Sequence, residues 1–150
     1  MENQSKIPGV AIQPLRQIVD ERGAVLHMLR HDSPLFERFG EIYFSLVFPG
    51  IVKAWKCHQR MTQNLAVPVG KIRLVIYDDR ETSAGRGEVE EHILGRPDEY
   101  YLVRIPPLLW YGFQGLGSTP ALVANCTDLA HDPDEVQRLP LLSSQIPYKW

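Results

Sequence analysis

Lys56 and His58 stand two residues apart in KAWKCH, a stretch with the residue types of a β-strand. Alternate side chains of a strand point to the same face, so the ammonium and the imidazole are expected side by side. Imidazole has a pKa near neutrality and suits a general base. A neighbouring lysine cation keeps that imidazole neutral and can hydrogen-bond an oxyanion. The pair therefore predicts a proton-transfer site with His58 as the base.

Aromatic residues elsewhere in the chain can complete this chemistry. Tyr111 is a candidate to return the proton from the other side, and Tyr43 is a second candidate acid. Trp55 and Trp110 can stack on a nucleobase, although tryptophans of this kind are more often buried in a core. Trp110 is retained as a candidate for substrate binding.

The two cysteines, Cys57 and Cys126, are expected to be reduced, half-buried thiols of a cytoplasmic protein. Neither belongs to a CxxC unit, so their spacing does not indicate a metal pair. Cys57 is the sequence neighbour of His58, and adjacent strand residues point to opposite faces. A nucleophilic thiol activated by that imidazole is therefore not favoured.

Short apolar or alternating runs separated by Gly, Pro, Asp and Ser indicate an all-β sandwich or barrel. The expected strands lie at 9–15, 24–30, 41–48, 51–58, 64–69, 71–78, 88–95, 100–106 and 121–128. Short helices are expected at 33–39 and 132–139, each with a capping residue followed by Pro. The tail 143–150 is expected to pack on the barrel or on a partner chain.

Length and charge narrow the function further. A chain of 150 residues suits one domain, here expected over 1–150. The net charge is −2 and the cations are scattered, which argues against nucleic-acid binding. No apolar run is long enough to span a bilayer, so no membrane partner is expected.

The spacing within 50–70 resembles the first conserved motif of the cupins, a family of jelly-roll β-barrels. That motif places glycines at both ends and His, His and Glu between them, and here Gly50, Lys56, His58, Gln63 and Gly70 occupy those positions. The second cupin motif, Pro-x-Gly-x-x-His, corresponds to Pro106, Leu108 and Tyr111. The resemblance implies a cupin-type jelly roll with one or two short helices. Only one imidazole remains at the four metal positions, so neither a metal nor another cofactor is expected.

Further motifs resemble the dTDP-4-dehydrorhamnose 3,5-epimerases and the related dTDP-sugar 3,4-ketoisomerases. In chain order they are DERG at 20–23, VKAW at 52–55, VGKIRLVIYDDRETSAG at 69–85, IPPLLWYGFQGLG at 105–117, CTD at 126–128 and IPYKW at 146–150. The resemblance covers the chain from about residue 20 to 150. It implies a nucleotide-sugar substrate and a homodimer that pairs or exchanges N-terminal strands.

The resemblance assigns roles with departures. The epimerase base corresponds to Lys56 and the epimerase acid to Ala124. The ketoisomerases match better, because their second, catalytic histidine corresponds to His58, with Gln63 also retained. Arg22 corresponds to an arginine that contacts the diphosphate.

Lys53 corresponds to a second such arginine. Strand alternation turns it away from Lys56 and His58 unless a bulge intervenes.

Two hypotheses follow from these residues. One is a metal-free epimerase or ketoisomerase acting on a nucleotide-linked keto-deoxysugar. The other is a non-catalytic relative that binds a sugar nucleotide or a partner protein through the same pocket. The losses at the family's catalytic positions favour binding alone, whereas a retained polar set, comprising Lys56, His58, Gln63 and Tyr111, favours catalysis.

Overall fold

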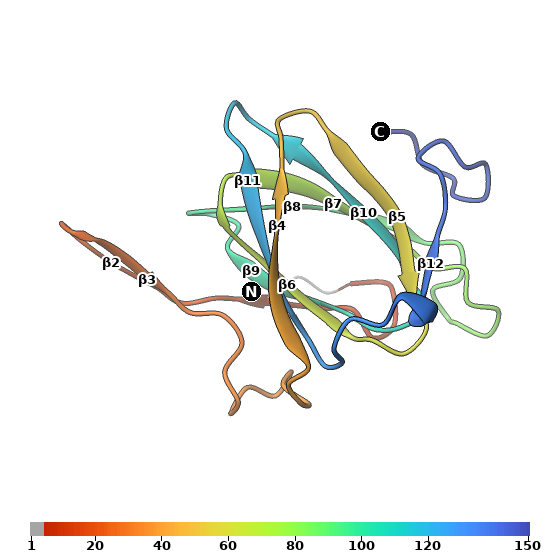
Figure 1. Cartoon of the computed structure of the whole chain (residues 1–150), viewed down its shortest axis with the longest axis horizontal. Coiled ribbons are helices and arrows are strands. Elements are labelled where there is room, and N and C mark those ends of the chain that lie inside the picture. The colour runs from red at the N-terminus through yellow and green to blue at the C-terminus, as the bar shows by residue number, and fades with distance from the viewer. Residues whose placement is uncertain (1–4) are drawn as a thin grey trace.

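Two five-stranded antiparallel sheets face each other in the computed structural model, which describes residues 5–150 (Figure 1). The first sheet has the order β1 (Ala11–Pro14), β9 (Tyr101–Ile105), β6 (Gln63–Val69), β11 (Ala121–Thr127) and β4 (Glu41–Val47). The second has the order β12 (Val136–Arg138), β5 (Val52–His58), β10 (Trp110–Leu116), β7 (Lys71–Tyr77) and β8 (Val89–Gly95). The all-β prediction is confirmed.

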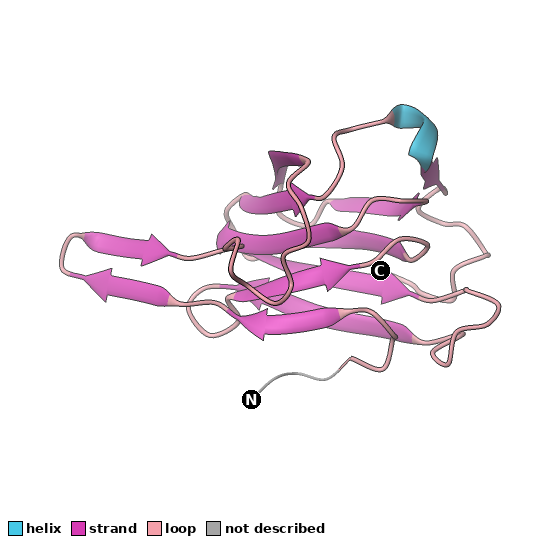
Figure 2. Ribbon diagram, turned by 90° about the horizontal axis from the view of Figure 1, so that it is seen from below, coloured by secondary structure: helices cyan, strands magenta, loops and turns pink. Residues whose placement is uncertain are grey.

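A separate hairpin, formed by β2 (Gln17–Asp20) and β3 (Gly23–Leu26), projects from one end of the barrel (Figure 2). All nine expected strands are present, with shorter bounds at several ends. The sequence reading missed β2, β10 and β12. The strand β10 contains two glycines, which are uncommon inside strands.

The core lies between the two sheets, where the strands place alternate apolar residues. Fully buried members include Leu65, Ile72, Leu74, Leu94 and Val103. A second apolar cluster covers the outer face of the second sheet. The two clusters give β5 and β10 two buried faces, one toward the barrel interior and one toward the tail.

The C-terminal tail builds this outer cluster, as expected. The ring of Trp55 lies 5.2 Å from that of Trp150 and 6.2 Å from that of Tyr148, measured between centroids. Its indole Nε1 donates a hydrogen bond to the carbonyl oxygen of Leu141 at 3.3 Å. Trp55 is therefore anchored from outside the barrel by residues far along the chain.

The helix predictions needed correction. Residues 33–39 form turns, because Ser33 caps only one turn and the side chain of Phe39 stays exposed, so no apolar face is buried to hold a helix. The second helix is only a 3₁₀ turn, η1 (Pro133–Glu135), with Asp132 accepting from the amide of Asp134 at 3.0 Å. The chain then pairs with β5 as β12. In residues 5–150 no helix has the length and apolar character that a membrane span requires.

Candidate active site

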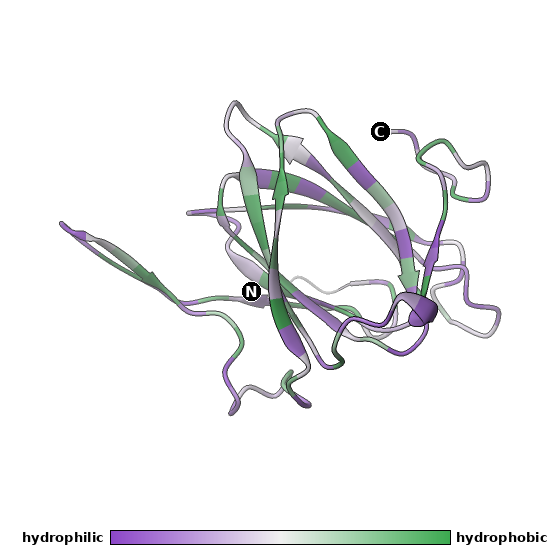
Figure 3. Ribbon diagram, viewed as in Figure 1, coloured by the Kyte–Doolittle hydropathy of each residue, from purple (hydrophilic) through white to green (hydrophobic). Residues whose placement is uncertain are grey.

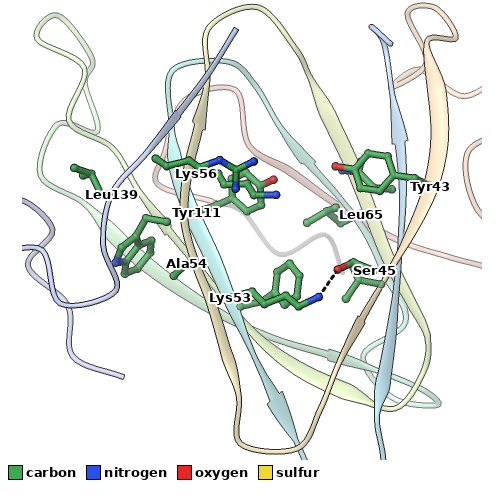
Figure 4. Close-up of a pocket in the computed structure, with 13 residues that line it drawn as sticks. Tyr43, Ser45, Lys53, Ala54, Lys56, Leu65, Tyr111 and Leu139 are labelled. Carbon is green, nitrogen blue, oxygen red and sulfur yellow. Dashed lines mark hydrogen bonds between the residues drawn. The ribbon is translucent and has the colours of Figure 1, made fainter. Parts of the chain in front are cut away.

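A cavity of about 350 Å³ opens between the two sheets, at the side where β4 faces β5 and β12 (Figure 4). Its lining includes Tyr43, Ser45, Lys53, Ala54, Trp55, Lys56, Leu65, Tyr111, Phe113, Val123, Asn125, Arg138 and Leu139. A second cavity of about 280 Å³ contains His58, Glu41, Met61, His131 and Val136. Because Tyr43, Lys56 and Arg138 line both, the two cavities adjoin.

A β-bulge brings Lys53 into the first cavity. Between β10 and β5, Tyr111 pairs with Lys56 but the next residue, Gly112, pairs with Ala54, which leaves Trp55 as an extra residue. A Cβ atom at Gly112 would lie 2.5 Å from the Cβ of Ala54, so the close approach of the strands requires glycine. The bulge reverses the alternation, and Lys53 reaches across to Ser45, with 3.0 Å between Nζ and Oγ (Figure 4).

His58 is buried and held by Glu135, the last residue of η1. Its Nδ1 is hydrogen-bonded to Oε1 of Glu135. The other carboxylate oxygen accepts from the backbone amides of Arg60 at 3.0 Å and Met61 at 3.2 Å. A carboxylate can only accept, so Nδ1 carries the proton and Nε2 keeps its lone pair. Within the described chain Nε2 has no hydrogen-bond partner.

The surroundings keep the imidazole neutral and the carboxylate charged. Burial lowers the pKa of His58, and the cations Lys56 and Arg138 lower it further against the opposing effect of Glu135. Burial alone would raise the pKa of Glu135, but hydrogen bonds from His58 and the two amides hold it below its ordinary value. A neutral imidazole oriented by a carboxylate is the arrangement of a general base.

Neutral polar groups form a connected network on the other side of Lys56. The hydroxyl of Tyr111 donates to Oε1 of Gln63 at 3.1 Å. Nδ2 of Asn125 donates to the same oxygen at 2.5 Å and to the hydroxyl of Tyr43 at 2.8 Å. The proton of Tyr111 is thus committed to Gln63, and burial raises its pKa. The hydroxyl of Tyr43 accepts from Asn125, so its own proton is free to be donated.

Comparison with known proteins identifies relatives over most of the chain. No family model matches the sequence. The chain is 32% identical over 146 residues to the spore coat polysaccharide biosynthesis protein SpsL of Bacillus subtilis (strain 168), a match covering 96% of each. It is 36% identical over 139 residues to the probable low-salt glycan biosynthesis epimerase Agl13 of Haloferax volcanii, covering 89% of this chain and 88% of that protein.

Solved structures give the same result. A dTDP sugar isomerase from Desulfovibrio desulfuricans G20 superposes with a TM-score of 0.95 at 56% identity, covering 97% of this chain and 92% of that one. The chain belongs to the RmlC-like cupin family. A dTDP-4-dehydrorhamnose 3,5-epimerase from Bacillus anthracis, at 17% identity and a TM-score of 0.87, shares the fold. The cupin-type jelly roll is therefore confirmed.

The metal positions of the cupin family do not suit a divalent ion here. Only His58 offers an imidazole nitrogen, its Nε2, and Oε1 of Gln63 already accepts two hydrogen bonds. Lys56 lies near the cations Arg138 and Lys53, and this positive charge repels a divalent ion. Across residues 5–150 no three His, Cys, Asp or Glu side chains gather as metal ligands do. The donors present favour proton transfer by side chains.

Two of the predicted substrate-binding residues, Arg22 and Trp110, lie outside the cavity. Arg22 sits on the projecting hairpin, where its guanidinium pairs with Asp20 at 2.6 Å and its side chain is 82% exposed. Trp110 belongs to the outer cluster, and its Nε1 donates to Asp79 at 3.1 Å. Since Tyr111 faces the barrel interior, the neighbouring Trp110 must face outward.

Cys57 also faces the outer cluster, away from His58. Burial raises the pKa of its thiol to about 12, so it is protonated at neutral pH.

Three residues of the site escaped the sequence reading. Glu135 and Arg138 fall in a segment expected to be helical, and Asn125 in a strand whose partners were unknown. The one sequence feature that pointed to Glu135 is DPDE at 132–135, where acidic residues follow a predicted helix start. Nothing in the sequence indicated that its carboxylate reaches a histidine 77 positions earlier.

Proposed function

We propose that the protein is an isomerase that moves a proton beside the carbonyl of a nucleotide-linked 4-keto-6-deoxyhexose, with His58 as the base. The observation that carries this proposal is the His58–Glu135 pair: Nε2 of His58 is buried without a partner, and His58 lines a cavity together with Lys56 and Tyr43. The relatives named as a dTDP sugar isomerase and a glycan biosynthesis epimerase support this reaction class.

The two walls of the cavity supply different groups, the base from one sheet and the acid from the other. Nε2 of His58 takes the proton from carbon, and Glu135 stabilises the imidazolium that forms. Arg138 supplies positive charge where the carbonyl oxygen becomes negative, and Lys56 lies beside it on the same cavity wall. Tyr43 lies on β4, in the opposite sheet, and donates a proton from the other side. Tyr111, Gln63 and Asn125 fix the position of the Tyr43 hydroxyl.

We propose Lys53 as the residue that binds the diphosphate. Its ammonium is exposed at the edge of the first cavity and held by Ser45. A compact ammonium is a suitable partner for phosphate oxygens. Arg22 would join it only if another chain supplied the projecting hairpin.

We propose a homodimer for that reason. The edge strand β4 directs Tyr43 and Ser45 inward and exposes Ile42, Phe44 and Leu46, which are 53%, 63% and 57% accessible; Figure 3 shows hydrophobic residues along this strand. Ile18, Val19 and Val25 of the hairpin are also exposed. Such apolar surfaces on an edge strand indicate a protein interface. Light scattering should give twice the chain mass, and the mass of a single chain would contradict the dimer.

We propose that the chain forms one domain, because both sheets share one core. We also propose a cytoplasmic location, which fits two buried, unpaired thiols.

The decisive experiment follows carbon-bound protons in heavy water. The protein is incubated with dTDP-4-keto-6-deoxyglucose, and deuterium uptake beside the carbonyl is measured by NMR. Uptake should fall by about 1,000-fold in His58→Asn, which keeps a polar side chain but removes the base. His31→Asn, at an exposed turn, is the matched control and should match the native protein.

No uptake by the native protein, together with thermal stabilisation by the sugar nucleotide, would contradict catalysis on this substrate. That result would leave binding without catalysis as the function.

A further inference from the structure

Lys56 occupies an unusual place in the cavity. It is half-buried on β5, and its cross-strand neighbours are Arg138 of β12 and Tyr111 of β10. Arg138, Lys56 and Tyr111 therefore form one row across three strands, with side chains on the same face. In Figure 4 Lys56 lies beside Tyr111, across the cavity from Tyr43.

No carboxylate or hydrogen-bond acceptor among residues 5–150 holds the Lys56 ammonium, whereas Lys53 has both Ser45 and the carbonyl of Leu46. Burial lowers the pKa of Lys56, and the cations Arg138 and Lys53 lower it further. A lysine that is partly desolvated beside another cation is the kind that becomes a neutral, nucleophilic amine. Such an amine attacks ketones.

We propose that Lys56 forms a Schiff base with the ketone of the sugar, an inference that rests on the proposed function. The neutral Nζ bonds to the carbonyl carbon, its two protons leave with the carbonyl oxygen as water, and a proton from solvent makes the imine cationic. The protonated imine then draws electrons from the adjacent C–H bond. His58, two residues along the same strand face, takes that proton at Nε2 and leaves an enamine. No oxidant or reductant enters the reaction.

The second half of the reaction decides its outcome. Tyr43 on the opposite wall protonates the enamine carbon, which inverts its configuration. Water then adds to the imine carbon, the C–N bond breaks, and the ketone and the free amine are restored. Hydrolysis returns the carbonyl to its original carbon, so this route epimerises the neighbouring centre and does not transfer the carbonyl. A Schiff base on Lys56 therefore leads to epimerisation and not to ketoisomerisation.

Reductive trapping tests the covalent step. The native protein is mixed with dTDP-4-keto-6-deoxyglucose and sodium cyanoborohydride, digested, and analysed by mass spectrometry. We expect the reduced sugar-nucleotide adduct on the peptide that contains Lys56. Lys56→Arg keeps a cation but cannot form an imine, so the adduct should vanish and turnover should fall by about 100-fold or more. Lys71→Arg, on β7 and paired with Glu99, should retain both.

Oxygen exchange gives a second readout. In ¹⁸O-labelled water the ketone of the product should carry the label at a rate tied to turnover, above the exchange of free substrate. Deuterium uptake at carbon without an adduct or enzyme-dependent ¹⁸O exchange would overturn the Schiff base alone. Lys56 would then act only as a cation at the enolate. Absence of both deuterium uptake and adduct would overturn the proposed function together with this inference.

Discussion

The two walls of the cavity differ in charge. The wall formed by β5 and β12 carries Lys56, His58 and Arg138, with Glu135 behind the histidine. In the first cavity the facing wall of β4 and β11 presents the neutral groups Tyr43 and Asn125, and the carboxylate of Glu41 on β4 lines only the second cavity. In the proposed reaction the charged wall takes a proton and stabilises an anion, while the neutral wall donates a proton and positions the substrate. A substrate bound between them is treated asymmetrically, as inversion at carbon requires.

Replacing Glu135 by Gln should have a larger effect than changes at Tyr43 or Arg138, because it removes the carboxylate that holds His58. We expect kcat to fall by about 100-fold, since the imidazolium loses its carboxylate partner. Glu135 raises the pKa of His58 against burial, so its loss should move the acid limb of the kcat profile to lower pH. Steady-state kinetics across pH measure both effects.

The control is Asp134→Asn, one residue earlier and exposed. An unchanged pH profile in Glu135→Gln would show that the carboxylate only supports the fold near η1.

Tyr43→Phe tests the neutral wall. Removing the hydroxyl should slow product formation by about 10- to 100-fold, the usual range for a lost acid, while deuterium exchange by His58 continues. Tyr111→Phe should have a smaller effect, because its hydroxyl is buried and bonded to Gln63. Exchange and product formation are followed in the same NMR experiment. Equal losses of both rates in Tyr43→Phe would contradict separate roles for the walls.

Arg138→Gln should produce the smallest change in activity. It tests how the positive charge of Arg138 affects the pKa values on the charged wall. Arg138 lowers the pKa of both His58 and Lys56. Its loss should raise both, so the acid limb moves to higher pH, opposite to the shift in Glu135→Gln. The other charged groups facing His58, which include Glu135, Glu41 and His131, are unchanged. Arg86→Gln, at an exposed turn, is the control, and a shift toward lower pH would refute this account.

Sequence patterns predicted the parts of the site that depend on local geometry. Alternation placed Lys56 and His58 on one face, and cupin-like spacing brought Gln63 and Tyr111 together, now seen as a hydrogen bond. The position of Lys53 depends on a bulge, which requires knowing that Gly112 pairs with Ala54.

Glu135 and Arg138 were missed for a similar reason. Residues 136–138 pair with the free edge of β5, and this pairing outweighs the helical tendency of 132–139. Such a long-range pairing cannot be predicted from the local sequence.

The short segment formed by η1 and β12 is a part of the fold that can be replaced as a unit. Six residues, 133–138, deliver both the carboxylate behind His58 and the cation beside Lys56. They attach at one edge of the barrel, by pairing with β5 and by the hydrogen bonds of Glu135 to His58, Arg60 and Met61. Changes within this segment can alter the acid–base balance of the site while the interior of the jelly roll stays intact. For protein engineering, grafting 133–138 between members of the family is therefore a compact way to retune the reaction.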